Sequence, residues 1–317
     1  MMSHTRIELF SGSSHPEFAK RVAEELGIEL SPMSIIRFAN DNIKVRPEVC
    51  VRGADVFVIQ TSVPPVNDHF MELLIMIDAL KHASAGRITS VMPYYPYVRS
   101  DKKDEPRISI TARLVADLVE TAGADRVLTM NLHSPQIQGF FRIPADQLLA
   151  IKVATDYFKE NYDLSNAVVV APDAGSAKRA GAYATRLNLP LAVMDKRRLA
   201  DDDQAHVYHV IGEVEGKDAI IFDDEISTAG SMIEAEKALR RMGAKTIRAF
   251  AVHGVLVGPA IERLKNSTID EVVVTNTIPL PKEKQIDKIT VLDVAPLFAE
   301  AIKRIHYGES VSALFKK

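Results

Sequence analysis

The hydrophobic residues of this chain alternate between short continuous runs and longer stretches with helical spacing. Runs such as VVVA (residues 168–171) and AIIF (residues 219–222) hold four apolar side chains in a row, as expected for strands buried on both faces. Between the runs, apolar residues recur every three or four positions, which predicts amphipathic helices. The pattern therefore predicts an α/β protein with doubly wound, mostly parallel sheets flanked by helices.

This pattern of strands and helices occurs twice along the chain. Residues 7–30 align without gaps with residues 168–191, and each copy gives a strand, a small polar turn, a helix and the start of a second strand. The segments that begin at Gly53 and Gly216 match in the same way, again as strand, loop, helix and strand. The repeat predicts two tandem domains of similar fold.

The division between the two domains should lie near residues 144–151, so we assign residues 1–147 to the first and 148–317 to the second. The copies differ most where strands run into loops. FDDEISTAGS (residues 222–231) in the second copy corresponds to IQTSVPPVND (residues 59–68), which lacks the adjacent acids and contains two prolines. Because ligands of open α/β sheets bind beyond the carboxyl ends of strands, only the second copy is expected to keep its site.

Composition narrows the class of protein. The chain has 317 residues, 47% of them hydrophobic, which is enough for two buried cores. A formal net charge of −3 provides no basic field for nucleic acid, and no stretch approaches the roughly 18 apolar residues of a membrane span. The start of the chain lacks the apolar core of a secretory signal, so we expect a cytoplasmic protein. The single cysteine, Cys50, excludes an internal disulfide framework, and we interpret it as a small apolar side chain of the interior.

The loop after one buried run combines acids with small residues. In FDDEISTAGS the apolar run is expected to end the strand before Asp223 and Asp224, and residues 227–231 precede a helix. The first amides of a helix and its dipole favour anions, and small side chains let a phosphate approach the backbone. Carboxylates accept hydrogen bonds from sugar hydroxyls or bind a hydrated cation. The stretch predicts a site for a ribose with a phosphate; the plainer alternative is a capped helix after solvated acids.

Other polar segments lie at corresponding strand ends. PDAGSAKR (residues 172–179), MDKRR (residues 194–198) and NLHS (residues 131–134) each follow a buried run. The segment PYYPYVRSDKKDEPRISITAR (residues 93–113) instead mixes many cations with acids and has no apolar period until Ile108. We interpret it either as a solvated loop or as a mobile flap that brings cations onto a polyphosphate.

Together these motifs resemble those of the ribose-phosphate diphosphokinases, also called phosphoribosyl diphosphate synthetases. The resemblance covers almost the full length and is carried by FSGSSH, FAN, YVRSDKKD, LHSPQIQGFF, PDAGSAKR, DKRR, FDDEISTAGS, VVVTNTIP and GESVSALF. It implies two phosphoribosyltransferase-like domains, with ATP-contacting loops and the flap in the first and the ribose 5-phosphate loop in the second. The implied reaction transfers the β,γ-diphosphoryl group of ATP, with Mg²⁺, to the C1 hydroxyl of ribose 5-phosphate. Members assemble dimers into larger rings, so a homo-oligomer, commonly a hexamer, is also implied.

The resemblance assigns roles to individual residues, which suit a transfer that depends on positioning and charge neutralisation. The residues implied for ribose 5-phosphate lie in one stretch: Asp223, Asp224, Ser227, Thr228, Ala229, Gly230 and Ser231. Those implied for ATP lie in two: Phe38, Asn40, Asp41, Asn42, Arg99 and Ser100. The implied metal ligands are His133 and Asp173. The implied catalytic cations are Lys196, Arg198 and Arg99.

Six positions depart from the family's usual residues, and Asn131 and Arg142 are two of them, where members often have aspartate. Asn42 and Ser100 stand where a glutamate and a glutamine are common in the nucleotide pocket, so the preferred donor nucleotide stays open. Glu225 and Ser227 stand where an apolar residue and an aspartate are usual, so one carboxylate has moved by two positions. In a strand or turn it could still face the same side.

Two other functions stay open. A non-catalytic homologue would bind sugar phosphate and regulate active partners, but a scaffold has no need of Lys196, Arg198 and the flap cations. A base phosphoribosyltransferase would use the same sugar loop, but it would leave the second domain and the flap without a task.

Overall fold

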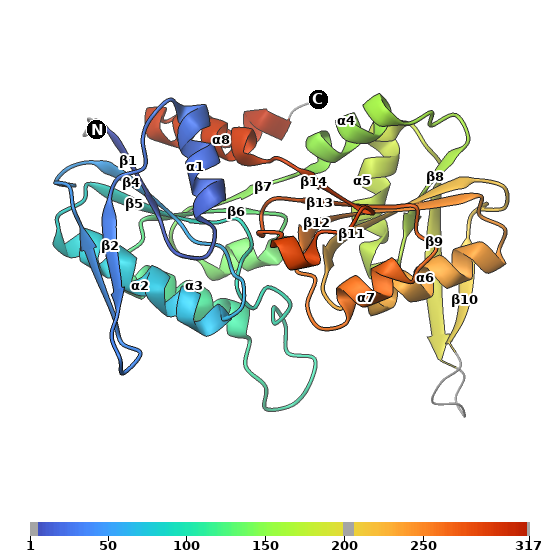
Figure 1. Ribbon diagram of the computed structural model, residues 1–317, viewed down its shortest axis with the longest axis horizontal. Helices are drawn as coiled ribbons and strands as arrows, with labels where there is room; N and C mark the ends of the chain where they lie inside the picture. Colours follow the sequence, from blue (N-terminus) through green and yellow to red (C-terminus); the bar gives the residue numbers. More distant parts are fainter. Residues whose placement is uncertain (1–5, 199–205, 316–317) are drawn as a thin grey trace. The chain divides into compact units, whose positions relative to one another are not determined.

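The structure, a computed structural model, describes residues 6–198 and 206–315 (Figure 1). The chain divides into two compact units. The first comprises Met1–Leu149, Thr277–Pro279 and Val294–Lys317, and the second comprises Ala150–Asn276 and Leu280–Asp293. None of the described helices is long and apolar enough to cross a membrane.

The first unit is built on a five-stranded parallel sheet. Its strands follow the order β1 (Ile7–Ser11), β4 (Asp55–Ile59), β5 (Arg87–Met92), β6 (Arg126–Met130) and β7 (Ala145–Leu148). The helices of this unit cover both faces of the sheet, one pair on each (Figure 1): α1 (Pro16–Leu26) with α8 (Ala295–Tyr307), and α2 (Val66–His82) with α3 (Thr111–Ala122). A separate antiparallel ribbon consists of β2 (Met33–Arg37) and β3 (Ile43–Pro47).

The second unit contains a seven-stranded sheet that is parallel except for one edge strand. Its strands follow the order β10 (His206–Ile211), β9 (Leu191–Arg198), β8 (Ala167–Ala171), β11 (Asp218–Ile226), β12 (Thr246–Gly254), β13 (Glu271–Thr275) and β14 (Ile289–Leu292). Its helices again lie on both faces (Figure 1): α4 (Ile151–Asn161) with α5 (Ala177–Leu187), and α6 (Gly230–Arg241) with α7 (Ala260–Lys265).

The repeat and the fold class are confirmed. Strands β8, β11, β12, β13 and β14 of the second unit have the same order as the five strands of the first. The copies differ after the first helix, where the second unit adds β9 and β10 to its sheet and the first unit forms the separate ribbon of β2 and β3. Two doubly wound, mostly parallel sheets result.

The end of the chain departs from the predicted domain division. The units divide at Leu149 and Ala150, close to the predicted position, but Val294–Lys317 belongs to the first unit rather than the second. Helix α8 packs on α1, where the rings of Phe18 and Phe298 lie 5.3 Å apart edge to face. An apolar helix face is visible in a sequence, but which sheet it covers is decided by contacts distant in the chain.

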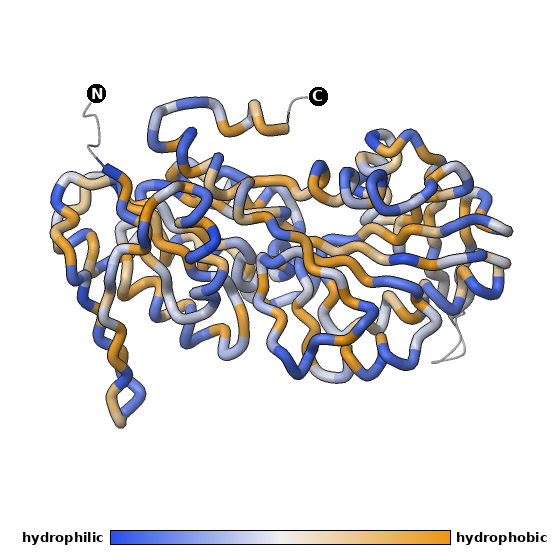
Figure 2. The backbone as a smooth tube through the Cα atoms, turned by 45° about the horizontal axis from the view of Figure 1, so that its top comes forward, coloured by the Kyte–Doolittle hydropathy of each residue, from blue (hydrophilic) through white to orange (hydrophobic). Residues whose placement is uncertain are grey.

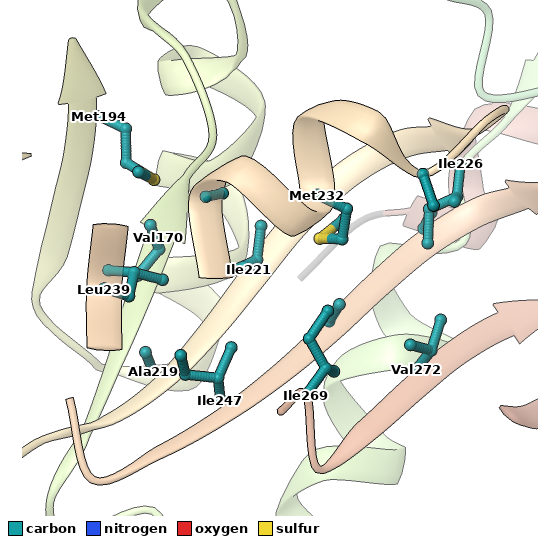
Figure 3. Close-up of a cluster of buried hydrophobic side chains, with 14 of the residues drawn as sticks. Val170, Met194, Ala219, Ile221, Ile226, Met232, Leu239, Ile247, Ile269 and Val272 are labelled. Atoms are coloured by element: carbon teal, nitrogen blue, oxygen red, sulfur yellow. The ribbon is translucent and has the colours of Figure 1, made fainter. Parts of the chain in front are cut away.

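Apolar side chains of the second unit fill the space between the sheet and α6 (Figure 3). Ile221 and Ile247 from the strands pack with Met232 and Leu239 from α6, and all four are nearly or fully buried. Figure 2 shows that the strands are mostly apolar along the backbone and that the connections between them are more hydrophilic. Cys50 is exposed, so its predicted interior position was wrong. Each core side chain contributes about 1.5–3 kcal/mol on burial, and the resulting rigid sheet holds the loops at its strand ends.

Candidate functional site

The acids of FDDEISTAGS lie within strand β11, which continues to Ile226. The prediction that this strand ends before Asp223 was wrong, because β12 pairs with β11 along the acids, placing Asp223 opposite Ala251 and Glu225 opposite His253. Successive residues of a strand point to opposite faces, so Asp223 and Glu225 share one face and Asp224 points to the other.

Asp224 points to the face covered by α5. Its Oδ1 accepts a hydrogen bond of 2.8 Å from Nη2 of Arg179, and this carboxylate is only 5% exposed. One turn along α5, Tyr183 stacks on Phe222 with ring centroids 4.2 Å apart. The second acid is therefore a buried, paired carboxylate rather than a solvated one.

Asp223 has a different environment on the other face of β11. Its Oδ1 accepts the backbone N–H of Asp224 at 2.9 Å and lies 3.5 Å from Nη2 of Arg179. Burial, followed by the neighbouring Asp224, raises the pKa of Asp223 well above its ordinary value and outweighs the opposing effect of Arg179. Asp223 therefore binds a proton more readily than an exposed aspartate does, and a protonated carboxyl can donate as well as accept a hydrogen bond.

A tight loop joins β11 to α6, as predicted, although the helix begins at Gly230. Ala229 is its N-cap and has φ 60° and ψ 8°, a left-handed conformation, while its carbonyl oxygen accepts the N–H of Ile233 at 3.0 Å. The carbonyl oxygen of Ser227 accepts the N–H of Val257, also at 3.0 Å. A left-handed residue at a helix start makes successive amides converge, which forms a concave anion site.

Two further predicted segments belong to strands beside β11. Asp173 follows β8 and caps a short turn: its Oδ1 accepts the N–H of Ser176 at 2.7 Å, while its own N–H is bound by the Ser176 hydroxyl. Lys196 and Arg198 belong to the backbone of β9, but their side chains lie outside the described part of the chain. Since β9, β8 and β11 are adjacent and parallel, their carboxyl ends meet at one edge of the sheet.

A metal ion would have few protein ligands here. Among residues 6–198 and 206–315, no three His, Cys, Asp or Glu side chains come together to hold one. Mg²⁺ retains water and binds through one or two carboxylates and substrate phosphates, so it does not require such a cluster. Asp173 is exposed at the strand end and suits that role. His133 follows β6 in the first unit, so the two predicted ligands come from different units and their shared role stays a prediction.

The residues predicted to bind ATP lie on two elements of the first unit. Residues 38–42 form the tip of the β2–β3 ribbon, where the N–H of Asp41 binds the carbonyl oxygen of Phe38 at 2.9 Å and 48% of Phe38 is exposed. Arg37 ties the ribbon to α2 through a 2.9 Å ion pair with Asp68. An exposed ring and polar groups at this tip are available to a ligand or a partner.

Arg99 and Ser100 lie in the predicted flap, residues 93–113, which has neither helix nor strand before α3 begins at Thr111. Ser100 closes its base: the Ser100 hydroxyl lies 3.3 Å from that of Thr111, and its carbonyl oxygen accepts the N–H of Ala112 at 3.1 Å. Arg99 is exposed. The loop between Ser100 and Thr111 projects beyond the helices of its unit (Figure 1).

In the first unit, side chains fill the position that corresponds to the sugar site. Gln60, which aligns with Asp223, accepts the N–H of Ser14 at 3.0 Å and donates to Glu72 at 2.8 Å. Glu72, only 4% exposed, also accepts the N–H and hydroxyl of Ser13 at 2.7 and 2.8 Å. The alignment of the two copies did not reveal these hydrogen bonds, because Glu72 lies in the following helix. Gly12 could have indicated them, since a Cβ at this position would lie 2.3 Å from Gln60 Oε1.

Known proteins resemble this chain along almost its whole length. The profile described as the N-terminal domain of ribose phosphate pyrophosphokinase matches residues 7–123, and that of the phosphoribosyl synthetase-associated domain matches residues 202–316. The ribose-phosphate pyrophosphokinase of Caldanaerobacter subterraneus is 55% identical over 309 residues, which cover 98% of each chain. The chain belongs to the ribose-phosphate pyrophosphokinase family.

Other members of the ribose-phosphate pyrophosphokinase family agree in length and fold. The member from Clostridium acetobutylicum is 50% identical over 319 aligned positions and 100% of both chains. The crystal structure of phosphoribosylpyrophosphate synthetase from Mycobacterium smegmatis has a TM-score of 0.92 and 44% identity, covering 96% of this chain and 100% of that chain. The resemblance expected from the motifs is confirmed, whereas the roles of individual residues stay predictions.

Proposed function

We propose that this chain is a ribose-phosphate diphosphokinase, forming 5-phospho-α-D-ribose 1-diphosphate and AMP for nucleotide biosynthesis. The observation that carries the proposal is the succession of β11, loop and α6, in which a strand that ends in acids is followed by a tight loop and the N-terminus of a helix. Burial of Asp224 argues against the plainer interpretation of solvated acids before a capped helix. Relatives about half identical along their full length carry the name of this activity.

The proposed reaction forms a bond between the C1 oxygen of ribose 5-phosphate and the β-phosphorus of ATP. The bond between that phosphorus and the oxygen it shares with the α-phosphate breaks, so AMP leaves and the C1 hydroxyl loses its proton. Residues 227–231 hold the 5-phosphate and Asp223 faces the ribose hydroxyls, while Asp224, paired with Arg179 on the opposite face of β11, supports the strand end from behind. This leaves the sugar fixed at both ends, which favours in-line transfer by positioning.

Cations compensate the charge that shifts during transfer. We assign this role to Lys196 and Arg198 of β9 and to Arg99 of the flap. Bound Mg²⁺ supplies further charge neutralisation on the diphosphoryl group. Asp173 and His133 would each sit by magnesium ions, whose other ligands would be substrate oxygens and water.

Assembly and location are further parts of the proposal. We infer a cytoplasmic homo-oligomer of dimers that builds a hexamer, in which Phe38 and Asn40 contact adenine from a neighbouring subunit. Apolar residues exposed on the ribbon support a partner there, since Ile36 is 46% and Phe38 48% exposed. Sedimentation analysis of the full chain measures the subunit number, and a monomer at micromolar concentration would contradict the assembly.

Phosphorus NMR of the full chain with ATP, Mg²⁺ and ribose 5-phosphate tests the reaction. The expected products are AMP and a C1 diphosphate. Asp223→Asn should reduce turnover, while Asp287→Asn, at an exposed position before β14, should not. If no common nucleotide triphosphate yields a C1 diphosphate, the proposal fails. The same panel, run with and without inorganic phosphate, identifies the preferred donor.

A further inference from the structure

Helices α6 and α7 lie side by side in the second unit (Figure 1), with a groove of about 400 Å³ between them. Charged side chains from both helices line it, including Lys237 and Arg263. Arg263 also reaches the loop before α6, where its Nη1 donates to the carbonyl oxygen of Thr228 at 2.9 Å. A Cβ on Gly230 would lie 3.3 Å from the same nitrogen, so the guanidinium lies against the first residue of α6.

This hydrogen bond fixes a peptide plane of the anion loop. In a trans peptide, the C=O and the following N–H point in opposite directions. Holding the Thr228 carbonyl therefore turns the N–H of Ala229 away from Arg263. The N–H of Val257 binds the Ser227 carbonyl in the same way and so orients the N–H of Thr228. Two consecutive amides of the loop are thus aimed by groups outside it.

The position of the charge also points to a ligand. A cation beside the N-terminus of a helix opposes the helix dipole and is unfavourable for the helix alone. An anion bound at the same N-terminus reverses that balance, because the cation and the helix amides then act on it together. An arginine that only stabilised the helix would lie at its C-terminal end, where the dipole favours a cation. Arg240 lies there and donates to the carbonyl oxygens of Lys245 and Thr268 at 2.7 and 2.6 Å.

We propose that Arg263 is a positioning residue for ribose 5-phosphate. It holds the Thr228 carbonyl and thereby presents the Ala229 amide to the 5-phosphate, without touching the sugar. The identity of the ligand rests on the proposed function. Because the 5-phosphate does not react, the contribution of Arg263 lies in binding and is the same before and during transfer.

Calorimetric titration with ribose 5-phosphate and steady-state kinetics test the proposal on the full chain. Arg263→Ala should weaken ribose 5-phosphate binding and raise its KM by about 10- to 100-fold, as for loss of a charge-assisted hydrogen bond. The kcat and the KM for ATP should change by less than about twofold. Arg263→Lys keeps a donor and should fall between the alanine variant and wild type.

Arg240→Ala provides the matched control, since it removes an arginine tie from the opposite end of the same helix. It should lower the unfolding midpoint and leave the KM for ribose 5-phosphate unchanged. Added guanidinium ion should restore binding to Arg263→Ala but not alter Arg240→Ala, because the groove between α6 and α7 is open to a small cation.

The outcomes separate this inference from the proposed function. If wild type turns over and Arg263→Ala binds ribose 5-phosphate normally, the positioning role is wrong and the function stands. If wild type forms no product, the function is wrong, and calorimetry still decides whether Arg263 supports sugar phosphate binding. Equal losses of affinity in the Arg263 and Arg240 variants would reduce the effect to general destabilisation and overturn the inference.

Discussion

Arg179 of helix α5 donates a 2.8 Å hydrogen bond to the carboxylate of Asp224 in strand β11. Asp224 is 5% exposed, whereas the side chain of Arg179 retains 32% exposure. The pair thus connects a helix to the strand end that carries the candidate sugar site. Loss of Arg179 would remove the cation that hydrogen-bonds to this buried carboxyl group.

Arg179→Ala should lower the free energy of unfolding by about 3 kcal/mol, because it removes the cation that hydrogen-bonds to the buried Asp224. Adding Asp224→Asn to this variant should recover part of the loss. Urea unfolding of the wild type, both single variants and the double variant measures the coupling. Strictly additive losses would show that the two side chains do not stabilise each other.

Asp223→Asn should gain stability relative to wild type as the pH rises. In the unfolded chain Asp223 has an ordinary pKa of about 3.8, whereas burial and the neighbouring Asp224 raise its pKa in the folded protein. Between these two values only the folded state holds the proton, so the wild type loses stability with rising pH until the raised pKa is passed. Asparagine does not titrate and avoids this loss.

Unfolding free energies at intervals between about pH 4 and pH 8 check this expectation. The difference between the free energies of unfolding of the variant and the wild type should grow as the pH rises above the unfolded-state pKa of about 3.8. A difference independent of pH would mean that the pKa of Asp223 is the same in the folded and unfolded states.

Lys196→Ala should reduce kcat by roughly 100-fold or more while ribose 5-phosphate binding stays nearly unchanged, as expected for a contact made in the transition state. Lys245→Ala, an exposed lysine beyond the end of α6, serves as the control. Single-turnover rates and calorimetric binding measure the two effects. Parallel losses of binding and turnover would indicate that Lys196 positions the substrate instead.

Phe298→Ala should destabilise the first unit by about 3–5 kcal/mol, because this ring of α8 is fully buried against Phe18 of α1. Hydrogen exchange should show the loss of protection in α1 and β1 before any in α4 or β8. Loss of protection first in the second unit would support the division of the chain that the sequence predicted.

Much of the fold follows from local sequence patterns. The predictions that were wrong concern features determined by contacts between distant segments of the chain. Continuous apolar runs predicted buried parallel strands, and the repeat predicted two domains of similar fold, whose sheets share a strand order in the structure. The end of β11 was misjudged because acids do not resemble a strand interior; pairing with β12 supplies the backbone hydrogen bonds that keep them extended. The place of α8 depended on its packing against α1, which no local pattern records.

In the candidate site, too, local sequence indicates some features, while others depend on residues distant in the chain. The sequence predicted the sugar loop and the strand ends around it, because small residues and acids have recognisable chemistry. It did not indicate that Arg179 pairs with Asp224, nor that Arg263 holds the loop, since both partners come from separate helices. Glu225 answers one question raised by the sequence: it lies on the face of β11 that carries Asp223.

The return of α8 to the first unit affects the order in which the molecule can be completed during synthesis. Every part of the second unit has been translated once Asp293 is added, whereas the first unit still lacks α8. The strands of the first sheet are all present by Leu148, but the α1 surface that receives Phe298 stays uncovered until α8 has been synthesised. On the ribosome, the amino-terminal unit is the last to be finished.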